Sequence, residues 1–107
     1  MSHYTSEDEI ETLVRDFESC KIDKTQFRHP QHLAVAAWYV QTLGREAALE
    51  RMRSGLFRFL DHHGVDRKKY NETVTVFWID QVADKLIAMG DDVSFVDKCN
   101  EVVKSMS

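Results

Sequence analysis

The chain of 107 residues contains few of the residues that interrupt helices, with only one proline and four glycines. An all-β protein of this length needs many more turn residues, so their scarcity argues against a sheet fold. Strong helix formers such as Glu, Lys, Arg, Ala and Leu are plentiful instead. The composition therefore predicts an all-α protein.

Cysteine is also scarce, and long apolar runs are missing. Cys20 and Cys99 lie far apart and lack Cys-x-x-Cys spacing, so we expect free thiols in a reducing compartment, with a disulfide as the less favoured alternative. The amino terminus is polar, unlike a signal peptide, and no apolar run approaches the ~18 residues of a membrane span. These absences predict a cytoplasmic protein without a membrane partner.

The charge balance is moderately acidic, with 14 Lys and Arg against 18 Asp and Glu, a formal net charge of −4. This excess of acid disfavours nucleic acid as a partner, because nucleic-acid binding requires a basic surface. Apolar residues make up 43% of the chain, which is sufficient for one hydrophobic core. We therefore expect a single helical domain over residues 1–107.

Hydrophobic periodicity predicts a bundle of about five helices. Apolar residues recur three and four positions apart, which places them on one helical face. Pro30 suits a first helical turn, and Gly44 suits the position after a last turn. Residues 73–79 are rich in β-branched and aromatic side chains, but their helical spacing continues beyond strand length and no partner strand is present. The predicted helices span approximately residues 6–20, 30–43, 45–63, 71–89 and 94–105.

Polar side chains from separate segments are expected to meet at one pole of this bundle. Short connections make successive helices antiparallel neighbours, so the start of the second helix, the end of the third and the start of the fourth should lie together. Four of the five histidines fall in these segments. The candidate site consists of His29, His32, His62, His63, Tyr70, Asn71, Glu72 and Thr73.

Part of this group has the composition of a metal site. His29 and His32 are three positions apart and can face one point from a helix. Together with His63 and Glu72 they would provide three imidazoles and a carboxylate, a ligand set for Zn, Fe or Mn. His62 is an alternative to His63 as the third imidazole.

Two interpretations without a metal remain open. In one, the histidines and Glu72 have a structural role as helix caps and as partners of helix dipoles. In the other, the polar groups line a pocket for an organic molecule, with Glu72 or a histidine as general base. The basic stretch 67–69 is expected to be a solvated loop, and the side chains expected in the core include Trp38, Phe77 and Trp78.

Two of these segments resemble a pattern found in a family of small bacterial all-helical proteins of unknown function. The similar residues are Phe27-x-His29-x-x-His32-Leu33 and Tyr70-Asn71-Glu72-Thr73-Val74-Thr75-x-x-Trp78. The resemblance implies a helix over residues 72–89 and one site formed by both segments, but no activity. The family often has histidine where this chain has Asn71, and asparagine is a poor transition-metal ligand, so this departure weakens the metal hypothesis.

Three classes of function remain open. In the first, the protein is a binding domain or an enzyme whose bound metal keeps an open coordination position. In the second, it has a metal-free pocket. In the third, it is an interaction module. As an interaction module it would form a homodimer or bind another protein through its third helix or the apolar faces of its second and fourth helices. The chain contains no Ser-His-Asp, phosphate-loop or dinucleotide motif, so the sequence specifies no reaction.

Overall fold

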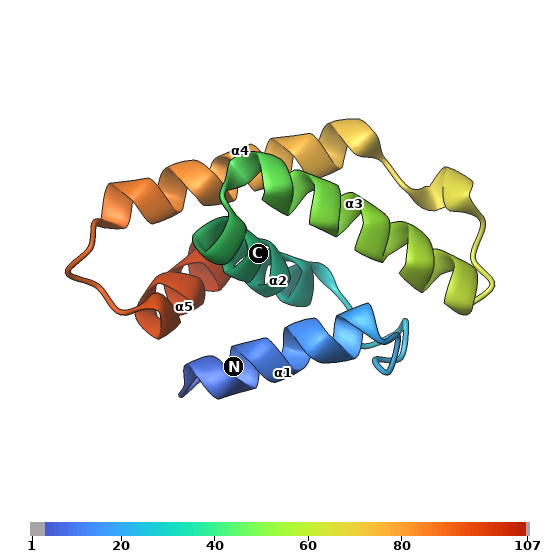
Figure 1. Ribbon diagram of the computed structural model, residues 1–107, viewed down its shortest axis with the longest axis horizontal. Coiled ribbons are helices and arrows are strands. Elements are labelled where there is room, and N and C mark those ends of the chain that lie inside the picture. Colours follow the sequence, from blue (N-terminus) through green and yellow to red (C-terminus); the bar gives the residue numbers. More distant parts are fainter. Residues whose placement is uncertain (1–3, 107) are drawn as a thin grey trace.

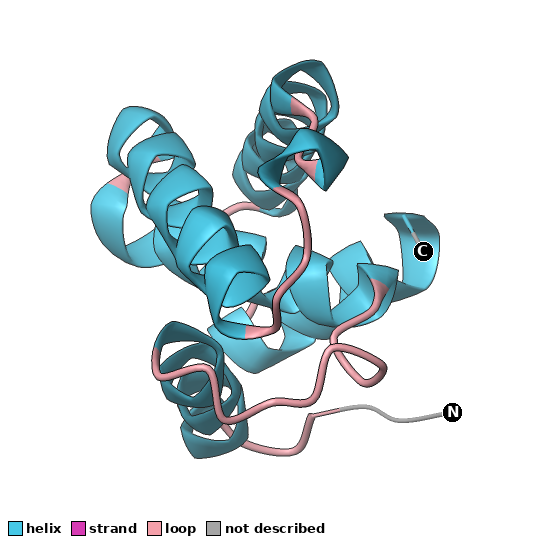
Figure 2. Cartoon of the chain, turned by 90° about the vertical axis from the view of Figure 1, so that its right-hand side faces the viewer, coloured by secondary structure: helices cyan, strands magenta, loops and turns pink. Residues whose placement is uncertain are grey.

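A computed structural model describes residues 4–106, which form five α-helices and one short 3₁₀ helix (Figure 1). No strand occurs in this described part (Figure 2). The prediction of an all-α bundle with five helices is confirmed, and each end lies within two residues of its expected position. The elements are α1 (Glu7–Glu18), α2 (His29–Leu43), α3 (Arg45–His62), η1 (Arg67–Lys69), α4 (Glu72–Met89) and α5 (Phe95–Met106).

Helix α2 is the centre of the bundle and packs against the other four α-helices. Its residues 33–37 form a continuous apolar run, and all five are buried. A helix that is apolar around its circumference needs neighbours on every side. Figure 1 shows this arrangement, with α1 below α2, α5 to its left, and α3 and α4 above it.

Three phenylalanines form an aromatic cluster where α1, α3 and the connection from α1 to α2 meet. The ring centroid of Phe27 lies 4.6 Å from that of Phe17 and 5.2 Å from that of Phe59. Gly55 of α3 faces this cluster, and a Cβ atom there would lie 2.6 Å from Cε2 of Phe17. Because that distance is shorter than van der Waals contact, the close packing of α1 on α3 depends on glycine at position 55.

Helix α4 begins beside the middle of α3 instead of beside its end. After α3, η1 and the following residues carry the chain back along α3 (Figure 1). The Glu72 carboxylate at the start of α4 accepts a hydrogen bond from Arg53 Nε at 2.9 Å. Nine residues separate Arg53 from the end of α3 at His62, which corresponds to about 14 Å along a helix. The end of α3 and the start of α4 therefore do not share one pole as the sequence had suggested.

The three aromatic side chains that the sequence placed in the core differ in their exposure to solvent. Trp38 and Trp78 are half-buried and pack against the core, as expected, but Phe77 is 52% exposed, so its assignment to the core is wrong.

Cys20 and Cys99 are both buried free thiols. None of the helices in residues 4–106 is long and apolar enough to cross a membrane.

Candidate functional site

A pocket with a volume of about 370 Å³ lies between α2, α3 and α4. Small-molecule sites usually have volumes of ~300–1,000 Å³, so this pocket is at the small end of that range. Most of its lining is hydrophobic and comes from all three helices. This apolar wall consists of Leu33, Ala36, Met52, Leu56, Leu60, Val74, Trp78 and Ile79.

The apolar wall follows from helical spacing. Met52, Leu56 and Leu60 are four residues apart on α3 and form one stripe along its inner side. On α2, Leu33 and Ala36 face the same space. Ala36 has a short side chain, so α2 does not fill the space between the two longer helices.

Polar side chains form a rim at the end of the pocket where α2 and α4 begin. The polar rim consists of Arg28, His29, Lys69, Tyr70 and Asn71. Asn71 is the N-cap of α4, and its Oδ1 atom accepts a hydrogen bond from the Val74 amide at 3.0 Å. An asparagine at this position therefore has a structural explanation, since N-cap side chains satisfy an amide that the helix leaves unpaired.

His32 lines the pocket below the polar rim. Its ring packs on Phe27, with 4.3 Å between the ring centroids. Burial first and the neighbouring His29 second lower the pKa of His32 to about 4, although a hydrogen bond with the Phe27 backbone opposes both effects. The imidazole is therefore neutral at pH 7 and presents a hydrogen-bonding group without a charge.

His29 is held at the edge of the pocket by two contacts. Its Nε2 atom donates to the carbonyl oxygen of Met106 at the end of α5, at 3.1 Å. Its ring also meets the Trp78 ring edge-on, with centroids 4.7 Å apart. Because a carbonyl oxygen can only accept, Nε2 carries the hydrogen in this contact.

His62 and His63 lie outside this pocket, at the far end of α3. The Nε2 atom of His63 is 3.1 Å from the carbonyl oxygen of Ile22, and its ring packs on Phe59 with centroids 4.4 Å apart. His62 is exposed and meets the His63 ring edge-on. His63 thus contacts the connection between α1 and α2, and neither histidine contributes to the pocket lining.

Glu72 is occupied by two neighbours and does not line the pocket. It accepts hydrogen bonds from the Arg53 guanidinium, with Nε at 2.9 Å, and from the Tyr70 hydroxyl at 2.6 Å. These bonds, that of Arg53 first, lower the pKa of Glu72 to about 2. Thr73, the next residue, is exposed and also lies outside the lining.

The predicted metal ligands do not come together. His29 and His32 share the pocket, but His63 bonds to Ile22 and Glu72 pairs with Arg53. Within residues 4–106, no group of three or more His, Cys, Asp or Glu side chains is arranged to hold a metal ion. The separation arises because the chain turns back after α3. Glu72 therefore lies beside Arg53, which is nine residues before the end of α3.

The cations and the apolar wall of the pocket were not expected from the sequence. Arg28 and Lys69 both line the pocket, although Lys69 was expected in a solvated loop. The spacing of Met52, Leu56 and Leu60 was a usable signal, but it predicts only an apolar face. Whether such a face fills the core or borders a cavity depends on the neighbouring helices.

The comparisons with known proteins add no relative. No family model, curated protein or solved structure matches the chain. The resemblance of residues 27–79 to a bacterial family therefore stays a prediction.

Proposed function

We propose that this protein binds a small, mainly apolar organic molecule in the pocket between α2, α3 and α4. The observation that supports this proposal is the pocket itself, with its volume of about 370 Å³ and its combination of an apolar wall with a polar rim. Such a combination is typical of ligand sites, in which hydrophobic surface supplies affinity and a few polar groups fix orientation.

The polar groups favour binding over proton-transfer chemistry. An efficient general base has a pKa near the working pH, whereas the pKa of Glu72 is about 2. The Tyr70 hydroxyl donates to that same carboxylate. His32 remains as the neutral group inside the pocket, where it can orient a ligand by a hydrogen bond.

Fluorescence of Trp78 provides a direct test, because its side chain lines the pocket. Trp38→Phe removes the other tryptophan of the chain and keeps an aromatic ring next to Phe95. Titration of this variant with decanol, a neutral amphiphile, should give a saturable change in Trp78 emission. A linear response without saturation would contradict the proposal.

Filling the pocket should abolish this binding. Thr75 is half-buried on α4 and lines the pocket, so Thr75→Phe places a ring in the space that the ligand would occupy. Ala36→Leu fills the pocket from α2 and gives an independent second variant. Ala88→Phe adds the same ring at an exposed position of α4 outside the lining and is the matched control. If Thr75→Phe and Ala36→Leu fold and still bind decanol with unchanged affinity, decanol binds outside this pocket.

Self-association through α4 is the second candidate function. Val74 and Phe77 are 47% and 52% exposed on adjacent turns, and Ile87 is 75% exposed farther along the same helix. Exposed apolar side chains of this kind are common in contact surfaces between subunits. Sedimentation velocity at high protein concentration should then detect a dimer that Phe77→Ser weakens. A strict monomer would remove this candidate.

A further inference from the structure

We infer that the ligand of this pocket is an amphiphilic carboxylate whose negative end lies at the polar rim. This inference rests on the proposed small-molecule function and adds the charge and size of the ligand. Three features of the described residues support it, namely two cations without ion-pair partners, two helix amino termini at one end, and an apolar wall of limited length.

The charged side chains around the pocket have a single sign. Arg28 and Lys69 are the only Arg or Lys residues in the lining, and no Asp or Glu is present there. The Nε atom of Arg28 donates to the Thr25 carbonyl oxygen at 3.0 Å. Neither cation forms an ion pair within residues 4–106, in contrast to the five arginines that do: Arg15, Arg45, Arg51, Arg53 and Arg67.

Two helix amino termini reach the same end of the pocket. Arg28 is the N-cap of α2 and His29 is its first residue, and Asn71 is the N-cap of α4. Unpaired amides and the helix dipole give each amino terminus a partial positive charge that favours an anion. The first turn of α2 contains no acidic residue. On α4, the charge of Glu72 is balanced by Arg53, away from the pocket lining.

The apolar wall limits the size of the remaining part of the ligand. A volume of about 370 Å³ corresponds to roughly a dozen non-hydrogen atoms, at the ~30 Å³ that a water molecule takes up in the liquid. A carboxylic acid with a medium-length alkyl chain, such as decanoate, has this size. One carboxylate matches the site because a monoanion is balanced by the cations at the rim without burial of a second negative charge.

A series of ligands with the same alkyl chain tests the charge preference. Decanoate, decanol and decylamine are titrated at neutral pH against the Trp38→Phe protein, with Trp78 emission as the readout. We expect decanoate to bind about tenfold more tightly than decanol, a factor that corresponds to ~1.4 kcal/mol, and decylamine to bind more weakly than both. The advantage of decanoate should decrease as salt is added, because the cations are exposed.

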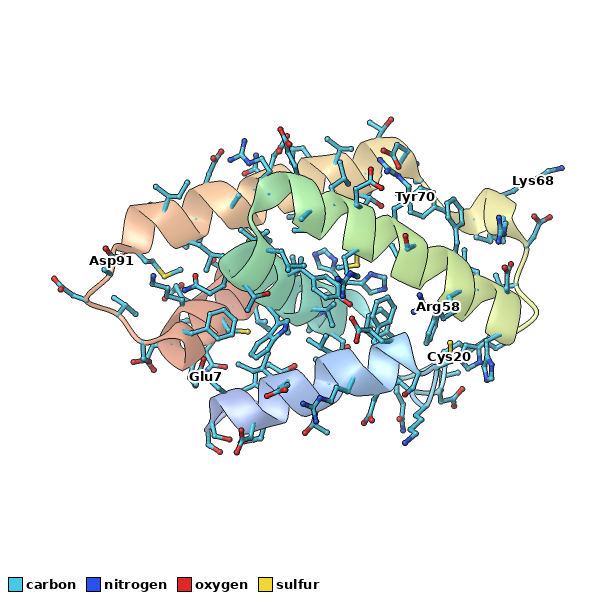
Figure 3. The ribbon with its side chains drawn as sticks, in the orientation of Figure 1. Glu7, Cys20, Arg58, Lys68, Tyr70 and Asp91 are labelled. Carbon is cyan, nitrogen blue, oxygen red and sulfur yellow. The ribbon has the colours of Figure 1, made fainter. Side chains whose placement is uncertain are left out.

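Neutralising the two cations should remove this preference. In the double variant Arg28→Gln with Lys69→Gln, decanoate should bind within about twofold of decanol, because the charge that distinguishes the two ligands is no longer recognised. Lys68→Gln is the matched control, because Lys68 projects away from the bundle and does not line the pocket (Figure 3). It should keep the wild-type preference.

The outcomes separate this inference from the proposed function. Equal binding of decanoate and decanol that Thr75→Phe abolishes would leave the small-molecule function intact and overturn the carboxylate. A decanoate preference that persists in the double variant would also overturn it, since the cations would not be its source. Failure of all three ligands to bind would contradict both proposals. Tighter binding of decylamine would reverse the inferred sign of the charge.

Discussion

The carboxylate of Glu72 accepts hydrogen bonds from the guanidinium of Arg53, and this pair joins the start of α4 to the middle of α3. The Nε atom of Arg53 is 2.9 Å from Oε1 of Glu72. Tyr70, a member of the polar rim, donates to the same carboxylate at 2.6 Å. The pair therefore helps to position the rim of the pocket, although neither of its members lines the pocket.

Glu72→Gln should destabilise the fold at neutral pH and lose this effect in acid. The pKa of Glu72 is lowered to about 2 by Arg53 first and by Tyr70 second. A carboxyl group with a depressed pKa stabilises the folded state above its unfolded pKa, and this contribution disappears as pH falls toward the folded pKa. Urea unfolding followed by circular dichroism should show a small difference between variant and wild type at pH 7, because exposed pairs are weak.

That difference should shrink between about pH 4.5 and pH 2 and should also shrink in high salt. Glu50→Gln is the control, since Glu50 accepts only one hydrogen bond from Arg53, at 2.7 Å, and is highly exposed. It should have the smaller effect at pH 7. A difference for Glu72→Gln that is constant from pH 7 to pH 2 would show that the charge of Glu72 has no role.

The positions of the helices were predictable because their signals are local. Apolar residues three and four positions apart, Pro30 in the first turn of α2 and Gly44 at its end bound the helix within one or two residues. Residues 73–79 illustrate the same point. Their β-branched side chains favour a strand, but packing of a longer helical stripe against α2 and α3 outweighs this intrinsic preference.

The candidate site was predictable only where helix order determined it. The antiparallel arrangement places His29 and His32 near Tyr70 and Asn71, and all four line one pocket. The path of residues 63–71 was not predictable in this way. There Asp66 accepts a hydrogen bond from the Lys68 amide at 2.9 Å, and η1 forms.

Long-range partners account for the other differences from the expected site. The Ile22 carbonyl contacts His63, and Arg53 pairs with Glu72, but neither partner is indicated by local sequence spacing. The involvement of Lys69 likewise depends on how far the chain turns back after α3. Such features arise from packing between elements, which hydrophobic periodicity does not describe.

Gly55→Ala should destabilise the protein although alanine favours helices. The added Cβ would lie 2.6 Å from Cε2 of Phe17, a fully buried ring that stacks on Phe27. Overpacking of a core costs about 1–3 kcal/mol, and the helix propensity gain offsets ~1 kcal/mol of it. We expect a net loss of up to about 2 kcal/mol in the free energy of unfolding, measured by urea denaturation.

A second substitution identifies the cause of this loss. Phe17→Leu removes the ring that the new Cβ would contact, so the two changes together should cost less than the sum of their separate effects. Ser54→Ala, at an exposed neighbouring position of α3, should change stability by no more than ~0.5 kcal/mol. Additive effects of Gly55→Ala and Phe17→Leu would contradict the steric explanation.

His32 should make the protein less stable as pH falls from 6.5 to about 4. Burial, the largest cause, lowers the pKa of His32 to about 4, so the unfolded state binds a proton in this range that the folded state does not. Stability should therefore decrease toward acid by up to ~1.4 kcal/mol per pH unit and level off below pH 4 for this group. Urea unfolding at closely spaced pH values measures the slope.

His32→Gln should flatten this part of the profile. His62→Gln is the matched control, because it removes an imidazole from an exposed position outside the pocket. The loss of stability that comes from His32 falls between pH 6.5 and about 4, whereas the loss that comes from Glu72 falls between about pH 4.5 and 2. The two contributions can therefore be measured separately. A slope between pH 6.5 and 4 that persists in His32→Gln would assign it to other groups.

Tyr39→Phe should cost about 1.5–3 kcal/mol in the free energy of unfolding, as is usual for a hydrogen bond to a charged group. The Tyr39 side chain is almost fully buried, and its hydroxyl donates to Glu18 Oε2 at 2.6 Å. Burial and then this hydrogen bond raise the pKa of Tyr39. Tyr70→Phe removes a bond of equal length from a half-buried tyrosine to Glu72, so water can replace it and the loss should be smaller. Equal losses in urea denaturation would show that burial does not determine the strength of these bonds.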